Sequence, residues 1–94
     1  MKIDPQTVLA LPRGVRLRKD PVRGKDVLLA PERAVALDDI AVAIVGAVDG
    51  TSTIDQIADK FAAEYGAPKE EILKDITNFA EEFVGRGLFE IVAR

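Results

Sequence analysis

The 94-residue sequence contains no cysteine, no histidine and no tryptophan. Without cysteine and histidine, the chain cannot form disulfides, use a thiolate nucleophile or build the usual zinc site. The side chain that most often acts as a general base near neutral pH is also missing. Catalysis would have to rest on carboxylates, lysines, hydroxyls or the single tyrosine. The composition therefore favours a binding protein over an enzyme, and we expect this chain to hold neither a metal nor a cofactor.

Long apolar runs are absent as well. The longest uncharged stretch covers residues 40–48, less than half of the roughly 20 residues that a membrane-spanning helix needs. The first residues mix charges with prolines and lack the apolar segment of a signal peptide. We therefore predict no membrane association and a cytoplasmic location.

The charges that are present divide along the chain. Hydrophobic residues make up 48% and charged residues 31% of the sequence, with a net charge of −3, as in ordinary folded domains. Residues 13–33 carry seven positive and three negative side chains, whereas residues 38–94 carry five positive and twelve negative ones. Halves of opposite sign can orient an approaching partner, although two ordinary solvated faces would give the same pattern.

The chain length predicts one domain. Residues 1–12 contain two prolines and show weak periodicity, which predicts a loosely held N-terminal arm. Residues 13–94 then form the single domain, and we find no repeats or low-complexity segments in it.

Three short strands are expected first. Residues 15–18 alternate apolar and basic side chains, the period of a half-buried strand. After turn-forming residues at 20–25, residues 27–30 are apolar throughout and suit a central strand. Pro31 predicts a tight turn into a third strand over residues 34–37.

Three helices follow the strands. Asp38 or Asp39 is the expected N-cap of the first helix, which is apolar on every side from residue 40 to 48 and should lie buried at the centre of the core. Thr53 and Gln56 fit a capping box for the second helix.

Gly66 ends the second helix, and Pro68 fits the first position of the third. A wide apolar stripe runs from Ile72 to Val84. The predicted fold class is α+β, a three-stranded antiparallel sheet followed by a three-helix bundle in the order βββααα, similar to a winged helix.

The edge of the third strand is the main candidate for function. Between Arg33 and Asp38 this strand has only small and apolar residues, although proteins usually protect an open edge with charges, prolines or bulges. An incoming peptide can add to such an edge as a further strand, with the third helix as a wall beside it. The alternative is that this helix covers the edge as part of the core.

Two other functions are disfavoured. A winged helix that reads DNA needs a basic recognition surface, but most charged residues of the third helix are acidic. The carboxylate pairs at 38–39 and 81–82 are sequence neighbours, which do not face each other on a helix. Neither a DNA-binding protein nor a carboxylate-based enzyme is therefore the preferred function.

Two segments carry a resemblance to a known family. Residues 27–33, VLLAPER, and residues 37–41, LDDIA, closely resemble the pyrroloquinoline quinone biosynthesis protein D (PqqD) family. The resemblance spans about residues 13–88. One departure is Lys25-Asp26, which replaces the more usual basic–aromatic pair before Val27.

The resemblance implies a non-catalytic peptide chaperone. Such a protein would bind a small ribosomally made precursor peptide (PqqA-like), whose glutamate and tyrosine become the quinone cofactor. It would present the peptide to a radical S-adenosylmethionine enzyme (PqqE-like), which carries the iron–sulfur clusters, and it would need no nucleic acid. A leader-peptide recognition domain of another modified-peptide pathway is the alternative.

On this basis we predict the peptide-binding residues. The strand would contribute its backbone and the third helix an apolar wall, although the sequence does not decide which stripe of the helix faces the groove. An unprotected strand and a C-terminal extension over residues 89–92 also suit a homodimer formed by strand exchange. The predicted site consists of Ala34, Val35, Ala36, Leu37, Ile72, Leu73, Asp75, Ile76, Phe79, Ala80 and Phe83.

Overall fold

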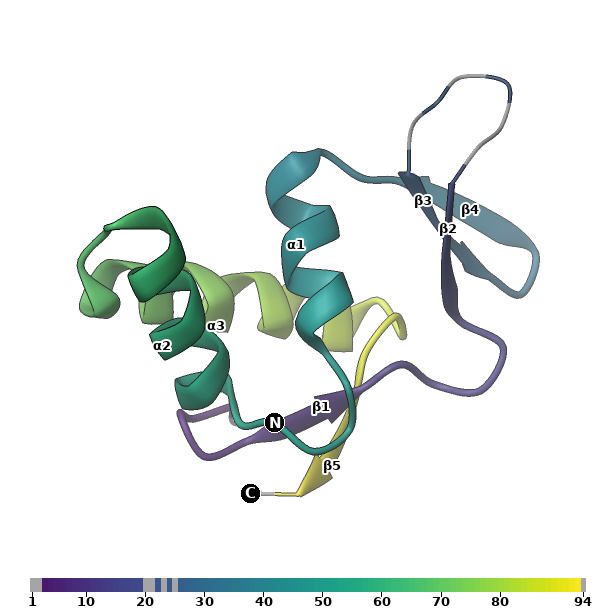
Figure 1. Cartoon of the computed structure of the whole chain (residues 1–94). Helices are drawn as coiled ribbons and strands as arrows, with labels where there is room; N and C mark the ends of the chain where they lie inside the picture. Colours follow the sequence, from purple (N-terminus) through teal and green to yellow (C-terminus); the bar gives the residue numbers. More distant parts are fainter. Residues whose placement is uncertain (1–2, 20–21, 23, 25, 94) are drawn as a thin grey trace.

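The structure of the chain, a computed structural model, describes residues 3–19, 22, 24 and 26–93. Most of the predicted turn at 20–25 therefore lies outside the described residues. Figure 1 shows the arrangement of the elements. In chain order they are β1 (Val8–Ala10), β2 (Arg16–Lys19), β3 (Asp26–Ala30), β4 (Arg33–Ala36), α1 (Asp39–Ala47), α2 (Ile54–Tyr65), α3 (Lys69–Gly85) and β5 (Glu90–Ala93).

The predicted three-stranded antiparallel sheet and the α+β class are confirmed. The strand order is β2-β3-β4, so β3 is central and β4 is an edge strand. Ala30 pairs with Arg33 across a two-residue turn. Pro31 is the first turn residue, and Glu32 takes the left-handed conformation with φ of 65°, which the second position of a type II turn requires.

The helices begin and end close to their predicted boundaries. The Asp38 carboxylate accepts a hydrogen bond from the Ala41 amide at 2.8 Å, and the capping box of Thr53 and Gln56 is present. Gly66 ends α2 with φ of 64°. Pro68 is the N-cap of α3, one residue before the predicted position. No helix within the described part of the chain combines the length and apolar character that crossing a bilayer requires.

The N-terminal segment differs from the expected loose arm. β1 pairs with β5 in a second, two-stranded sheet, with Leu9 opposite Ile91. Leu9 is 1% exposed, and Ile3 is also buried. The Ile54 amide donates to the Thr7 carbonyl at 3.0 Å. Sequence periodicity did not reveal this strand because its partner lies at the other end of the chain. The pairing also holds the C-terminal extension, which was expected to suit strand exchange between copies.

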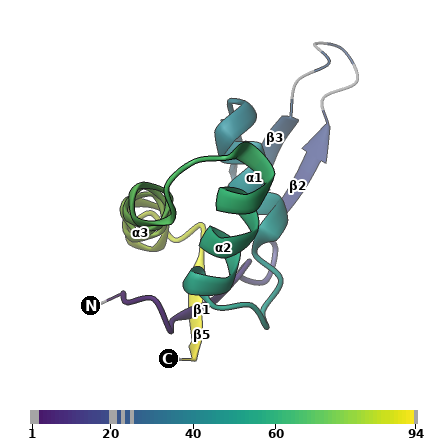
Figure 2. The same cartoon turned by 60° about the vertical axis from the view of Figure 1, so that its left-hand side comes forward.

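The helices and the three-stranded sheet form two layers. Figures 1 and 2 show all three helices on one side of the sheet. Leu28 faces the helices and has no exposed surface. The core contains side chains from every helix, including Ile44 and Val45 of α1, Ile57 and Phe61 of α2, and Ile76, Ala80 and Phe83 of α3.

The expectation that α1 is buried on every side is wrong. Ala41, Ile44 and Val45 form its buried stripe, but Ile40 is 73% exposed. Val42, Ala43 and Ala47 are partly buried against the core, so the side of α1 that carries Ile40 is the one left at the surface. The exposed side becomes important for the candidate site.

The position of β1 in the core can be tested with Leu9→Ala. Removal of a fully buried leucine side chain should lower the free energy of unfolding by about 2–5 kcal/mol, measured by urea denaturation. Val92→Ala is the control on the paired strand, since Val92 is 53% exposed and should change the free energy by about 0.5 kcal/mol or less. Equal, small effects of both substitutions would show that the N-terminal segment is loosely held.

Candidate functional site

The lateral edge of β4 has unpaired backbone groups. The Leu37 amide donates to the Asp26 carbonyl at 3.2 Å. Since hydrogen-bonded and non-hydrogen-bonded pairs alternate along an antiparallel ladder, the Arg33 and Val35 backbones also face β3. The amides and carbonyls of Ala34 and Ala36 therefore point away from the sheet.

These outward groups have no partner within the described part of the chain. Two residues with one donor and one acceptor each offer up to four main-chain hydrogen bonds to an added strand. The prediction that all four residues 34–37 offer their backbone is too broad. Val35 and Leu37 are already bonded to β3, so only Ala34 and Ala36 provide the free edge.

One end of β4 is fixed against the end of α3. The Arg33 guanidinium donates to the Arg86 carbonyl. Arg86 in turn pairs with Glu82 at 3.2 Å and lies 5.6 Å from the centre of the Phe83 ring. These contacts place the start of β4 beside the C-terminal turn of α3, as the predicted strand-and-helix site requires.

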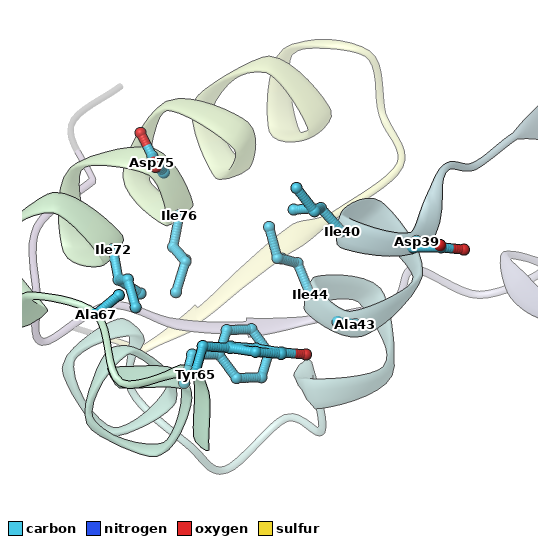
Figure 3. A pocket seen from close by; sticks show the side chains of 10 residues that line it. Asp39, Ile40, Ala43, Ile44, Tyr65, Ala67, Ile72, Asp75 and Ile76 are labelled. Atoms are coloured by element: carbon cyan, nitrogen blue, oxygen red, sulfur yellow. The ribbon is translucent and has the colours of Figure 1, made fainter. Parts of the chain in front are cut away.

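An apolar cavity lies near the other end of β4, just beyond the start of α1. Figure 3 shows isoleucine side chains of α1 and α3 pointing toward one another, with Tyr65 beneath them. The cavity has a volume of about 370 Å³, enough for an aromatic side chain. It is lined by Asp39, Ile40, Ala43, Ile44, Phe61, Tyr65, Ala67, Ile72, Asp75 and Ile76.

Two large apolar side chains at the mouth of this cavity are exposed to solvent. Ile40 is 73% and Tyr65 is 60% exposed. The Tyr65 ring meets the buried Phe61 ring edge to face, with centroids 5.8 Å apart. Exposed apolar residues that adjoin a cavity often mark a binding surface, and Ile40 follows the end of β4 by four residues.

Two carboxylates stand at the rim. Asp39 and Asp75 both line the cavity, but Figure 3 shows their oxygens directed away from its middle. Asp39 lies in the first turn of α1, where the helix dipole favours a negative charge. The interior is therefore suited to an apolar side chain, with negative charge only outside it.

Most of the predicted apolar residues of α3 lie in the core or are half-buried beside it. Ile76, Ala80 and Phe83 are buried in the core, although Ile76 also reaches the cavity. Ile72 and Phe79 are half-buried, and Phe79 stacks on Phe83 with centroids 4.1 Å apart.

Leu73 lies on another side of α3. It borders a separate cavity of about 290 Å³ beside the N-terminal segment, together with Ile3 and Pro5. The stripe that faces the α1 cavity is therefore the one containing Ile72, Asp75 and Ile76. Leu73 does not belong to this site.

Sequence reasoning missed the contributions of α1 and α2. Ile40, Ala43 and Ile44 of α1 and Phe61 and Tyr65 of α2 form most of the cavity. The sequence offered one indication. If α1 buries only one stripe, Ile40 and Ala43 lie outside that stripe and remain available for a site. How close Tyr65 comes to α1 depends on how the helices pack, and the spacing of apolar residues in the sequence does not predict that packing.

A charged cluster fixes the corner between α2 and α3. The Lys69 ammonium pairs with Asp55 and Asp59, each at 2.9 Å. Hydrogen bonds to Asp55 and then Asp59 raise the pKa of Lys69 above its usual value. Lys69 lies two residues after Ala67, which lines the cavity, so the cluster links the starts of α2 and α3 close to it. The described residues contain no group of three or more side chains that could hold a metal ion.

The exposed residues at the mouth should contribute little to stability. Ile40→Ser is expected to change the free energy of unfolding by about 0.5 kcal/mol or less, measured by urea denaturation. Tyr65→Ser should cost about 0.5–1.5 kcal/mol because it removes the ring contact with Phe61. Ile44→Ala, one helical turn from Ile40 and 4% exposed, should cost about 2–5 kcal/mol. A loss of more than about 2 kcal/mol for Ile40→Ser would mean that Ile40 belongs to the core.

Comparison with known proteins gives concordant matches in sequence and structure. The sequence model of the family described as Coenzyme PQQ synthesis protein D (PqqD) matches residues 27–88. A PqqA binding protein of Rhizobium meliloti (strain 1021) is 56% identical over 90 residues, which cover 96% of this chain and 92% of that protein.

Two solved structures are similar in fold. One is the solution NMR structure of the PqqD truncation of Methylobacterium extorquens PqqCD, described as a functional, stand-alone recognition element for ribosomally synthesised and post-translationally modified peptides. It has a TM-score of 0.81, 44% identity and 95% coverage of both chains. The crystal structure of PqqD from Xanthomonas campestris has a TM-score of 0.57, 39% identity and 99% coverage of both chains.

Proposed function

The chain belongs to the family of coenzyme PQQ synthesis protein D, and on this premise we propose that it is a peptide chaperone that binds a PqqA-like precursor peptide. The free edge of Ala34 and Ala36 carries the proposal. The peptide adds beside β4 as a fourth strand of the sheet. The name of the Rhizobium relative and the description of the Methylobacterium domain as a recognition element support this function.

The cavity beside α1 receives an apolar side chain of the same peptide. A peptide that pairs with Ala34 and Ala36 and continues past Ala36 reaches the start of α1 and the exposed Ile40. An aromatic or branched aliphatic side chain inserted there would be covered by Ile44, Tyr65 and Ile72. The backbone edge supplies affinity for any extended peptide, whereas the cavity selects among side chains.

The expected affinity is moderate. Four main-chain hydrogen bonds contribute about 0.5–1.5 kcal/mol each, and burial of one large apolar side chain adds about 1.5–3 kcal/mol. Further side-chain contacts are offset by the cost of ordering the peptide. These contributions sum to about −3.5 to −9 kcal/mol, and a value of about −8 kcal/mol, near the favourable end, corresponds to a micromolar dissociation constant, which allows the peptide to be passed on.

The chemistry belongs to a partner. We propose that the chain is not itself a catalyst and that it presents the peptide to a PqqE-like radical S-adenosylmethionine enzyme. The relatives are named for binding or recognition, which supports this division of roles. Since the enzyme needs S-adenosylmethionine and iron–sulfur clusters, the proposed complex forms in the cytoplasm.

Ala36→Pro tests strand addition. Proline removes the outward amide of Ala36 and places its ring on the lateral edge, so binding of a labelled PqqA-like peptide should weaken by about tenfold or more in a fluorescence anisotropy titration. The matched control is Lys19→Pro on the opposite edge strand. The Lys19 amide also points outward, because the neighbouring Arg18 is the residue whose backbone faces Val27 of β3.

Both proline variants should retain the circular dichroism spectrum of the original protein. Binding that is lost in Ala36→Pro and retained in Lys19→Pro supports the β4 edge. Equal binding by the original protein and Ala36→Pro would rule out strand addition at this edge.

Ala43→Phe tests the cavity. The half-buried Ala43 lines the cavity, and a phenylalanine there occupies the space proposed for the peptide side chain. The affinity for the peptide should fall by about tenfold in the same titration, while Ala63→Phe on the exposed side of α2 should leave it unchanged. Unchanged affinity of a folded Ala43→Phe variant would exclude the cavity from the binding site.

A further inference from the structure

The side of the three-stranded sheet that faces away from the helices has an unusual composition. Residues directly opposite each other in the ladder point to the same face of the sheet. The register pairs Arg16 with Leu29 and Arg18 with Val27. It also pairs Val27 with Ala36 and Leu29 with Ala34. These six residues form what we call the outer sheet face: Arg16, Arg18, Val27, Leu29, Ala34 and Ala36.

The burial pattern confirms this assignment. Leu28, on the opposite face, has no exposed surface, and its neighbours Leu17 and Val35 pack against the hydrophobic core. Val27 and Leu29 are only half-buried, and they are not among the side chains that pack against the core. Figures 1 and 2 show the helices on the other side of the sheet. No described element covers the outer sheet face.

An uncovered face of an antiparallel sheet is normally polar. Here four of the six residues are apolar, and the remaining two are arginines. Arg16 and Arg18 are exposed and form no ion pair within the described part of the chain. Arginine can lay its apolar stem over such a strip while its charged group remains available. An apolar centre bordered by arginines is typical of protein interfaces.

We propose that the outer sheet face is the docking surface for an acidic protein surface on the enzyme that receives the peptide. Carboxylates of the partner would pair with Arg16 and Arg18, because guanidinium and carboxylate match in shape and charge. Small or apolar partner residues would cover Val27 and Leu29. The positive charge of this face contrasts with the excess of negative charge in residues 38–94, so an acidic partner is directed to the sheet rather than to the helices.

This surface continues into the peptide site. The identity of the occupant rests on the proposed function, since a peptide paired with Ala34 and Ala36 would extend the same sheet. Alternate side chains of the peptide would then lie beside Ala34 and Ala36 on the outer sheet face. A partner docked there would contact the protein and the presented peptide together, and each ligand should strengthen the binding of the other.

Charge and shape favour a protein over a nucleic acid. Phosphate recognition depends on several basic contacts, whereas this face has two arginines along one side of an apolar strip. Carboxylates flank it along the chain at Asp26 and Glu32. A nucleic acid would leave Val27 and Leu29 uncovered.

The test uses the full-length chain with the double substitution Arg16→Glu/Arg18→Glu. Two probes are titrated, a labelled PqqA-like peptide and a purified PqqE-like radical S-adenosylmethionine enzyme, and the enzyme is measured with and without peptide. We expect peptide affinity within about twofold of the original and enzyme affinity reduced by about tenfold or more.

The original protein should bind the enzyme more weakly as salt is raised, and the double variant should show a smaller salt effect. Lys60→Glu/Lys74→Glu, the same charge change on exposed helix positions, is the control and should bind both probes normally.

Several results would overturn the proposal. Unchanged enzyme affinity of the arginine variant, or an equal loss in the lysine control, would show that the outer sheet face is not the docking surface. Loss of peptide binding in the arginine variant would show that the face is not separable from the peptide site. Arginine-dependent binding of duplex DNA in place of the enzyme would assign the face to nucleic acid. If the original protein fails to bind the peptide, the proposed function fails, but enzyme binding without peptide still tests this surface.

Discussion

The hydrogen-bond alternation of the β3–β4 ladder is the constraint on which the account depends. An antiparallel edge strand can satisfy only every second residue through its neighbour. The bonded residues are Arg33 and Val35 of β4 and the following Leu37, fixed by the turn at Pro31 and Glu32 and by the Leu37–Asp26 hydrogen bond. The same register assigns the free groups to Ala34 and Ala36. A shift of one residue would reverse both sets and also turn Val35 away from the core.

In the proposed complex, the helices give this edge its selectivity. Backbone pairing alone accepts almost any extended segment, so a preference must come from side chains near the strand. The Arg33–Arg86 contact fixes one end of β4 to α3, and α1 begins at the other end beside the apolar cavity. Ile40 and Tyr65 remain exposed at its mouth, where they add little to folding but can be covered by a ligand. In the proposed complex, the peptide would contact the edge and the cavity, and its enzyme would contact the outer sheet face.

Local signals in the sequence predicted most of the fold. The caps at Asp38, Thr53 and Gly66, the turn at Pro31 and the central strand all depend on neighbouring residues, and the structure bears them out. The pairing of β1 with β5 joins the two ends of the chain, so no local pattern revealed it. Ile40 was misplaced because an apolar helix looks buried on every side when its packing partners are unknown. The sequence predicted a candidate site at the strand edge but did not predict the cavity, since Phe61 and Tyr65 approach α1 only after the helices have packed.

Amide hydrogen exchange at β4 tests the central claim most directly. In the free protein the Ala34 and Ala36 amides should exchange rapidly, whereas the Val35 amide, bonded to β3, should be protected. With a PqqA-like peptide at 100 times its dissociation constant, exchange at Ala34 and Ala36 should slow by up to about 100-fold, because only the unbound fraction remains open. Rapid exchange of both amides in the saturated complex would contradict strand addition at this edge.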